Sequence, residues 1–171
     1  MNLYLIGYRG VGKSTVARLL AERLQRTFLD ADVELERRAG RTIADIFAAD
    51  GEGVFRELES DVIADLARRH DLVVALGGGA VMREQNRAAL AGGRIVWLTA
   101  DAETILARVT SDATTTERRP NLTTSGGLDE IVQLLAVRDP VYRQCAALTV
   151  DTEGKSPGQV VDEIVASLAR E

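Results

Sequence analysis

The chain has 171 residues and a formal net charge of −5, with 46% hydrophobic and 27% charged residues. This composition is typical of a globular protein with a buried core, and it excludes a disordered, collagen-like or disulfide-stapled chain. The length suits one domain, so we expect residues 1–171 to form a single unit. The acidic balance argues against a general nucleic-acid-binding surface.

The longest apolar runs, such as residues 72–76, fall far short of the ~20 residues that a membrane helix needs. The first residues lack the basic start and the cleavage site of a secretory signal. The single cysteine, Cys145, has no partner for an internal disulfide and no metal-ligand spacing. We therefore expect a cytoplasmic protein without a membrane or nucleic-acid partner. We also expect a monomer, although no pattern in the sequence indicates the oligomeric state.

Five short apolar runs predict the buried strands of a parallel sheet. They are nearly continuous rather than alternating, as expected where helices cover both faces of a sheet. The runs are Leu3–Ile6, Thr27–Asp30, Leu72–Leu76, Arg94–Leu98 and Ala147–Asp151. Apolar residues at helical spacing lie between them, which predicts a doubly wound α/β domain with right-handed crossovers.

Two helix starts are marked by capping residues. Thr42, with Asp45 three residues later, predicts a capping box that opens a short helix, and a long helix follows around Phe55–Leu66. Ser156, with proline next and glutamine three residues later, predicts the start of a C-terminal helix.

Residues Gly7–Ser14, Gly-Tyr-Arg-Gly-Val-Gly-Lys-Ser, match the pattern G-x-x-x-x-G-K-[ST] between an apolar strand and an amphipathic helix. Glycines let such a loop turn its N–H groups inward, and the helix N-terminus adds positive charge. Lys13 can reach the β- and γ-phosphates, and the Ser14 hydroxyl can ligate Mg²⁺. The loop predicts a nucleoside triphosphate site. Arg9 at its variable third position either faces solvent or adds charge near the nucleotide.

The guanine-recognition pattern N-K-x-D is absent, and the chain is small for a motor ATPase, so a small-metabolite kinase fits best. Asp30 and Asp32 follow the second strand, at the edge of the sheet that faces the ligand crevice. One carboxylate there can hold Mg²⁺ through water, and the other can accept a proton from an attacking hydroxyl. Alternatively, Asp32 only caps the helix that follows it.

Three further features bear on an acceptor site. Arg56 and Glu59 lie one helical turn apart, and alone would indicate a surface ion pair. Three consecutive glycines, Gly77–Gly79, favour close approach of a ligand to the main chain after the third strand, with a plain turn as the alternative. Arg138 falls near the end of a helical run, where a single arginine usually lies on the surface.

The segment Thr110–Gly127 is rich in Thr, Ser, Asp and Gly, which predicts either a functional lid or a disordered loop. Arg118 and Arg119 within it can bring guanidinium groups over a transferred phosphate when the segment closes. The alternative is an exposed basic pair.

In this order along nearly the whole chain, the motifs resemble those of the shikimate kinase family. They are Gly7–Ser14, Asp30-x-Asp32, Phe55-Arg56, Gly77–Gly79, Arg119-Pro120 and Arg138-x-Pro140-x-Tyr142. The resemblance implies a P-loop kinase of the nucleoside-monophosphate-kinase type, with a five-stranded parallel sheet, a substrate-binding region at about 32–60 and a lid at about 110–127. It also implies ATP-dependent phosphorylation of the 3-hydroxyl of shikimate, with Mg²⁺ as cofactor, on the route to chorismate and aromatic amino acids.

Carried over by position, the resemblance assigns four sets of residues. The ATP-binding set is Gly10, Val11, Gly12, Lys13, Ser14, Thr15, Arg108 and Arg119. The shikimate-binding set is Asp32, Arg56, Gly77, Gly78, Gly79 and Arg138. The metal-binding set is Ser14 and Asp30. The catalytic set is Lys13, Asp32 and Arg119. Two other readings stay open, namely a related kinase for gluconate or a nucleotide, and a nucleotide-gated regulatory protein.

Overall fold

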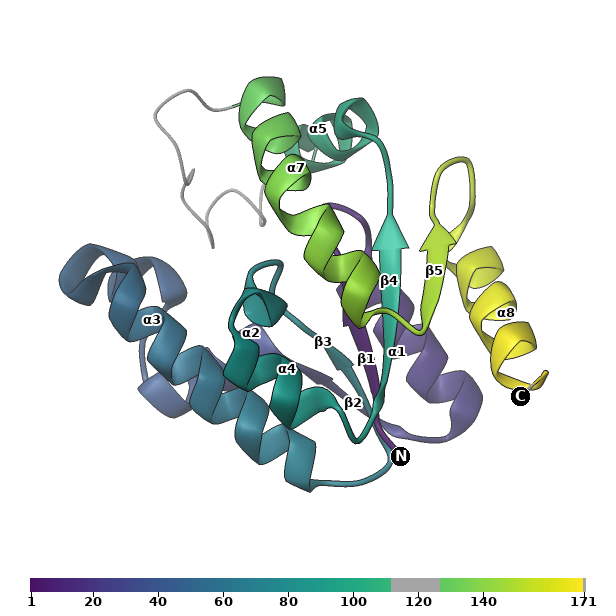
Figure 1. Cartoon of the computed structure of the whole chain (residues 1–171), viewed down its shortest axis with the longest axis horizontal. Coiled ribbons are helices and arrows are strands. Elements are labelled where there is room, and N and C mark those ends of the chain that lie inside the picture. The colour runs from purple at the N-terminus through teal and green to yellow at the C-terminus, as the bar shows by residue number, and fades with distance from the viewer. Residues whose placement is uncertain (112–126, 171) are drawn as a thin grey trace.

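The computed structural model describes residues 1–111 and 127–170. Its centre is a parallel sheet in the order β2-β3-β1-β4-β5 (Figure 1). The strands are β1 (Leu3–Ile6), β2 (Thr27–Asp30), β3 (Leu72–Ala75), β4 (Arg94–Thr99) and β5 (Leu148–Asp151). The five predicted strands are confirmed, with no end displaced by more than one residue. The predicted α/β class is confirmed with them.

Helices connect the strands and cover both faces of the sheet (Figure 1). They are α1 (Lys13–Leu24), α2 (Ala31–Ala39), α3 (Ile43–Arg68), the 3₁₀ turn η1 (Ala80–Met82), α4 (Glu84–Leu90), α5 (Ala102–Ser111), α7 (Leu128–Cys145) and α8 (Pro157–Leu168). Within the described ranges, no helix combines the length and the apolar character needed to cross a membrane.

Side chains of the central strand alternate between two buried clusters. Leu3 and Leu5 pack with apolar residues of α1 and α8, whereas Tyr4 and Ile6 pack with those of α2, α3 and α4. All four side chains are at most 2% exposed. Because both faces are covered, the strand reads as continuously apolar in the sequence.

Both predicted capping boxes are present. Thr42 caps α3 together with Asp45, and Ser156 caps α8 together with its glutamine. Gly51, at φ 80° and ψ 177°, interrupts α3 and separates a short first segment from the long helix behind it. This kink accounts for the two helices that the sequence predicts in this region.

Three of the chain segments with predicted chemistry leave the sheet at the carboxyl ends of the strands. The phosphate loop follows β1, the aspartate pair follows β2 and the glycine triplet follows β3. Because β3 lies between β1 and β2, the glycine triplet lies between the other two segments at this edge. The ends of the predicted lid belong to regular elements, since Thr110 and Ser111 are part of α5 and Gly127 caps α7. Arg118 and Arg119 lie outside the described residues.

Candidate active site

The phosphate loop adopts a conformation that only glycine tolerates at two of its positions. Gly10 and Gly12 have φ values of 84° and 92°. A Cβ at Gly10 would also lie 2.8 Å from a methyl group of Val109 on α5. Gly12 is the N-cap of α1, so the loop ends where that helix contributes its free N–H groups. Lys13 Nζ folds back over the loop and donates a hydrogen bond to the Tyr8 carbonyl at 2.8 Å.

Ser14, in the first turn of α1, and Asp30, the last residue of β2, come together at the carboxyl edge of the sheet. Ser14 Oγ donates to Asp30 Oδ2 at 2.5 Å. Asp30 Oδ1 accepts from the backbone N–H groups of Asp32 and Val33, at 3.0 and 3.4 Å. Asp30 is therefore the cap of α2, which begins at Ala31. The alternative in which Asp32 caps a helix starting at Val33 is wrong, so the Asp32 carboxylate is not used as that cap.

The oxygen pair of Ser14 and Asp30 fits a magnesium ion. Mg²⁺ prefers hard oxygen ligands and keeps several of its waters, so it needs only one or two protein ligands. The described residues contain no group of three or more His, Cys, Asp or Glu side chains that could enclose a metal. A hydroxyl and a carboxylate beside a phosphate loop suit a metal that is held mainly by phosphate and water.

Two arginine side chains pack onto the backbone of the glycine triplet. A Cβ at Gly79 would lie 2.5 Å from both terminal nitrogens of Arg56, and one at Gly78 would lie 3.0 Å from Arg138 Nη1. The Gly77 carbonyl accepts from Ala80 N–H at 3.0 Å and so opens η1. The sequence predicted that a ligand approaches this backbone. In the structure, guanidinium groups occupy that space, and a ligand would meet their outer faces.

Carboxylates of α3 fix the orientation of Arg56. Glu59 Oε2 accepts from Arg56 Nη1 at 2.7 Å, and Glu52 Oε1 accepts from Arg56 Nη2 at 3.2 Å. The side chains of Arg56 and Glu59 are only 13% and 3% exposed. The surface ion pair considered from the sequence is therefore an interior pair. Its low exposure makes the direction of the guanidinium fork much less variable than it would be in water.

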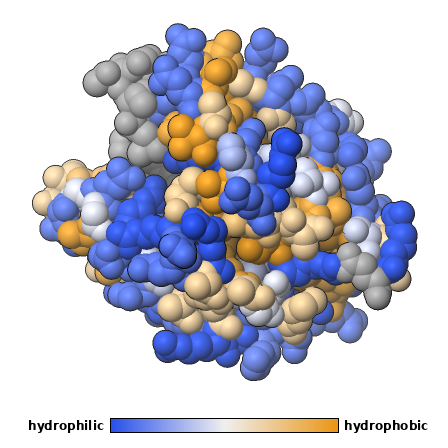
Figure 2. Space-filling model, in the orientation of Figure 1, coloured by the Kyte–Doolittle hydropathy of each residue, from blue (hydrophilic) through white to orange (hydrophobic). Residues whose placement is uncertain are grey.

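Helix α7 buries two charged side chains and exposes two valines. Glu130 and Arg138 are 1% and 8% exposed, whereas Val132 and Val137 are 50% and 68% exposed. Apolar side chains accordingly gather over α7 on the surface that Figure 2 shows. The helix also runs past Pro140 to Cys145, so Arg138 lies within it and not near its end. The buried face of α7 also includes Ile131 and Tyr142, so it combines charged side chains with core packing.

Tyr142, one turn beyond Arg138, anchors this helix to the glycine triplet. Its hydroxyl donates to the Gly78 carbonyl, and its side chain is fully buried. Burial raises the pKa of Tyr142 to about 12, so the hydroxyl keeps its proton and remains a donor at neutral pH. Tyr142 thereby holds the Arg138 segment against the backbone that Arg138 covers.

A cavity of about 210 Å³ opens on the other side of the phosphate loop. Arg108, on α5, lines it and donates to Thr152 through Nη1 at 2.9 Å and Nη2 at 3.1 Å. Lys155 and Pro157 contribute to the same wall, and the loop side includes Thr15. The full lining set is Gly10, Val11, Gly12, Thr15, Val16, Arg108, Thr152, Lys155, Pro157 and Val160. The phosphate loop and Arg108 thus share one cavity, as a nucleotide site requires.

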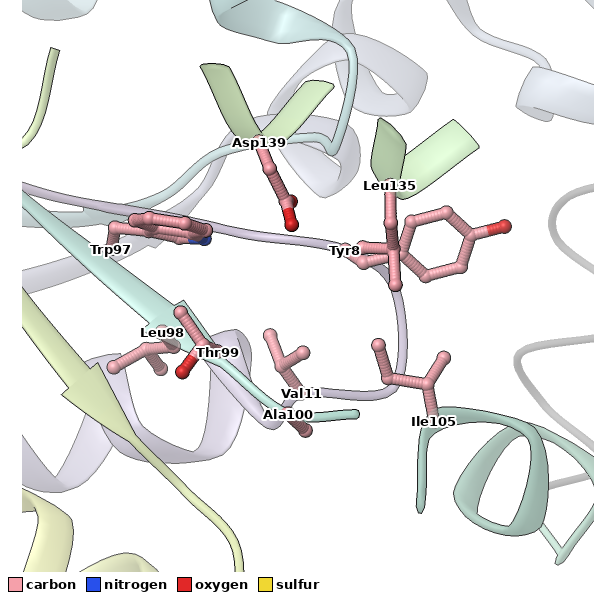
Figure 3. Close-up of a pocket in the computed structure, with 9 residues that line it drawn as sticks. All are labelled: Tyr8, Val11, Trp97, Leu98, Thr99, Ala100, Ile105, Leu135 and Asp139. Atoms are coloured by element: carbon pink, nitrogen blue, oxygen red, sulfur yellow. The ribbon is translucent and has the colours of Figure 1, made fainter. Parts of the chain in front are cut away.

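A second cavity, of about 200 Å³, lies behind the phosphate loop (Figure 3). Tyr8 and Val11 line it from the loop, and Leu135 and Asp139 line it from α7. The Asp139 carboxyl group points into this cavity, whereas the Tyr8 hydroxyl points away from it. Burial raises the pKa of Asp139, against the opposing effect of Arg143.

The comparison with protein families decides the assignment. The model of the family described as shikimate kinase matches residues 9–169. The chain belongs to the shikimate kinase family. A shikimate kinase from Pseudomonas savastanoi pv. phaseolicola is 47% identical over 169 residues, which cover 98% of this chain and 96% of that protein. One from Rhodopirellula baltica is 42% identical, with coverage of 96% and 88%.

Solved structures agree with the shikimate kinase family. A shikimate kinase from Acinetobacter baumannii, solved in complex with shikimate, superposes with a TM-score of 0.92 at 39% identity. The match covers 99% of this chain and 93% of that one. A gluconokinase from Sinorhizobium meliloti 1021 reaches a TM-score of 0.57 at 19% identity, which shows a shared fold alone.

In this shikimate kinase-family site, sequence reasoning missed the contributions of Thr152, Lys155 and Pro157 to the Arg108 cavity. Their position in the sequence could have indicated them, because they follow the fifth predicted strand and flank the predicted start of the last helix. The motif Arg138-x-Pro140-x-Tyr142 contains Tyr142 but does not indicate its partner. Its hydrogen bond to Gly78 joins residues 64 positions apart, and no local pattern carries that information.

Proposed function

We propose that this protein is a shikimate kinase, which transfers the γ-phosphoryl group of ATP to the 3-hydroxyl of shikimate. The products would be shikimate 3-phosphate and ADP, on the route to chorismate and aromatic amino acids. The observation that carries the proposal is the pair of guanidinium groups, from Arg56 and Arg138, over Gly79 and Gly78. Shikimate is a small carboxylic acid, and planar guanidinium groups bind carboxylates through two parallel hydrogen bonds.

The nucleotide would occupy the phosphate loop and the Arg108 cavity. The N–H groups at the start of α1 and the Lys13 ammonium would bind the phosphate oxygens. On nucleotide binding, Lys13 would exchange its bond to the Tyr8 carbonyl for a phosphate oxygen. The cavity lined by Arg108 and Thr152 would take the adenine base, since it adjoins the same loop.

Ser14 and Asp30 would hold Mg²⁺, Ser14 directly and Asp30 through water. When bound, the ion neutralises negative charge on the β- and γ-phosphates. The hydrogen bond between the two side chains keeps both oxygens in one place before any ligand arrives.

Asp32 would orient the 3-hydroxyl and accept its proton as the new bond forms between that oxygen and the γ-phosphorus. The bond between the γ-phosphorus and the β–γ bridging oxygen breaks, and its electron pair leaves with ADP. Lys13 would stabilise the charge on the transferring oxygens. Arg119, which lies outside the described residues, would add a second cation there by its resemblance to the family's lid arginine.

The test is acceptor-dependent ADP release by the purified protein with ATP and Mg²⁺. Shikimate should stimulate release, and quinate, gluconate and nucleoside monophosphates should not. Stimulation by gluconate or a nucleotide in place of shikimate would make the protein a related kinase. Nucleotide binding without stimulation by any acceptor would favour a regulatory protein. A cytoplasmic location, a monomeric state and one domain over residues 1–171 stay predictions from the sequence.

Gly79→Ala should selectively weaken shikimate binding. The new Cβ would displace the Arg56 guanidinium, whose terminal nitrogens lie 2.5 Å from that position. Since a hydrogen bond to a charged group is worth ~1.5–3 kcal/mol, we expect KM for shikimate to rise about tenfold to 100-fold. KM for ATP should change little. Gly92→Ala is the matched control, because no atom lies within 4 Å of the added methyl group. Equal KM values for shikimate in both variants would show that Arg56 does not bind the shikimate carboxylate.

A further inference from the structure

Arg9 of the phosphate loop faces the body of the protein. Its Nη2 lies 3.9 Å from Glu130 Oε1, and the two side chains are 19% and 1% exposed. Glu130 belongs to the first turn of α7. Neither sequence-based interpretation of Arg9, as a solvent-facing side chain or as charge near the nucleotide, describes this contact. A carboxylate this deeply buried is costly to maintain unless a cation lies beside it.

The Tyr8 ring extends this contact toward the acid-binding arginine. The guanidinium carbons of Arg9 and Arg138 lie 6.0 and 5.6 Å from the ring centroid. Tyr8 is 2% exposed, so its ring meets both guanidinium groups inside the protein. Glu130, Arg9, Tyr8 and Arg138 therefore form one connected group. Two of its members lie in the phosphate loop and two on α7.

Apolar packing does not fill the space between the loop and this helix. The cavity of about 200 Å³ lies between them, with Tyr8 and Val11 on one side and Leu135 and Asp139 on the other (Figure 3). A well-packed interface fixes the distance between its two sides through many short contacts. Here those contacts are interrupted, so polar contacts around the cavity carry more of that role.

We propose that Arg9 and Glu130 are positioning residues, which hold the phosphate loop at a set distance from α7. This inference rests on the proposed function, because the alignment it explains is between phosphates at Lys13 and an acid at Arg138. Phosphoryl transfer depends strongly on such alignment, and a displacement of about 1 Å can cost about 10²-fold in rate. The pair acts through the loop and through α7, and it does not itself touch the reacting atoms.

A double-mutant cycle with Arg9→Met, Glu130→Gln and the double variant tests the proposal. We expect each single variant to lose about tenfold in kcat, with KM for ATP and for shikimate each within about twofold of the wild-type value. The double variant should lose no more than the worse single variant, since either change breaks the same contact. Asp129→Asn, an exposed carboxylate in the same helical turn, is the control for the loss of negative charge there.

Three results would overturn the proposal. Multiplied losses in the double variant would show that the residues act independently. A rise in KM for ATP confined to Arg9→Met would make Arg9 a nucleotide ligand. A fall in melting temperature with unchanged kcat would show that Arg9 and Glu130 contribute only to the stability of the fold.

Hydrogen exchange of the loop amides, measured without ligands, separates this inference from the proposed function. Both single variants should exchange faster than the wild type at residues 7–12, whichever acceptor the enzyme uses. Unchanged exchange rates in both single variants would refute the positioning role of Arg9 and Glu130, even if shikimate proves to be the substrate.

Discussion

Lys13→Ala is expected to lower kcat for shikimate phosphorylation by about 10³-fold, because it removes the one ammonium group that the phosphate loop carries. The fold should survive. Lys13 is the first residue of α1, and alanine is the most favourable residue in a helix. The Lys13 ammonium group donates to the Tyr8 carbonyl, which lies in the same loop, at 2.8 Å. Steady-state kinetics of shikimate-dependent ADP release, on protein whose melting temperature is checked, measures the effect.

The matched control for Lys13→Ala lies at the other end of the same helix. Arg23 pairs with Asp162 at 3.6 Å, and both side chains are more than 60% exposed. Arg23→Ala removes one positive charge from α1 without approaching the crevice, so its kcat should stay near the wild-type value. Equal activity in the two variants would mean that Lys13 does not stabilise the transferring phosphoryl group.

Asp32→Asn is expected to lower kcat by about 10²- to 10⁴-fold, the range typical of a lost general base. The substitution keeps the size of the side chain and its capacity to bond a hydroxyl, but the amide cannot accept the proton. KM for shikimate should therefore change much less than kcat. Asp30 provides the cap of α2, so the substitution leaves that cap in place, and the melting temperature of the variant checks its folding.

Asp71→Asn is the control for Asp32→Asn. Asp71 precedes β3, at the opposite edge of the sheet, and its side chain is 72% exposed. Its φ of 57° is in the left-handed region, which asparagine tolerates. A kcat for Asp32→Asn that stays within a few-fold of this control would reduce Asp32 to an orienting residue.

Much of the fold could be predicted because its signals are local. Apolar runs bounded by polar residues located all five strands, and capping residues located the starts of α3 and α8. The phosphate loop is equally local, since its glycines and Lys13 act within eight consecutive residues. Such signals depend on backbone sterics and short-range hydrogen bonds, which the sequence states directly.

The remaining features depend on contacts between distant segments. No local rule distinguishes Asp30 from Asp32 as the cap of α2, and none shows that the Arg56 fork rests on Gly79. The charged residues between Glu34 and Arg38 give no local sign of burial, since a run of charges is typical of a solvated helix face. In the structure Glu34 is 8% exposed, and its hydrogen bond from Arg37 lowers its pKa to about 2. Burial of a charged group becomes evident only when its neighbours in space are known.

The hydrogen bond between Ser14 and Asp30 has a consequence for the cost of binding. Asp30 ends β2, and Ser14 lies in the helix that follows β1. Because β3 lies between β1 and β2, the bond links two segments whose strands are not neighbours in the sheet. These two residues at the base of the crevice are thereby in contact before a ligand binds. Little conformational entropy remains to be lost there on association, and more of the contact energy is left to distinguish one acceptor from another.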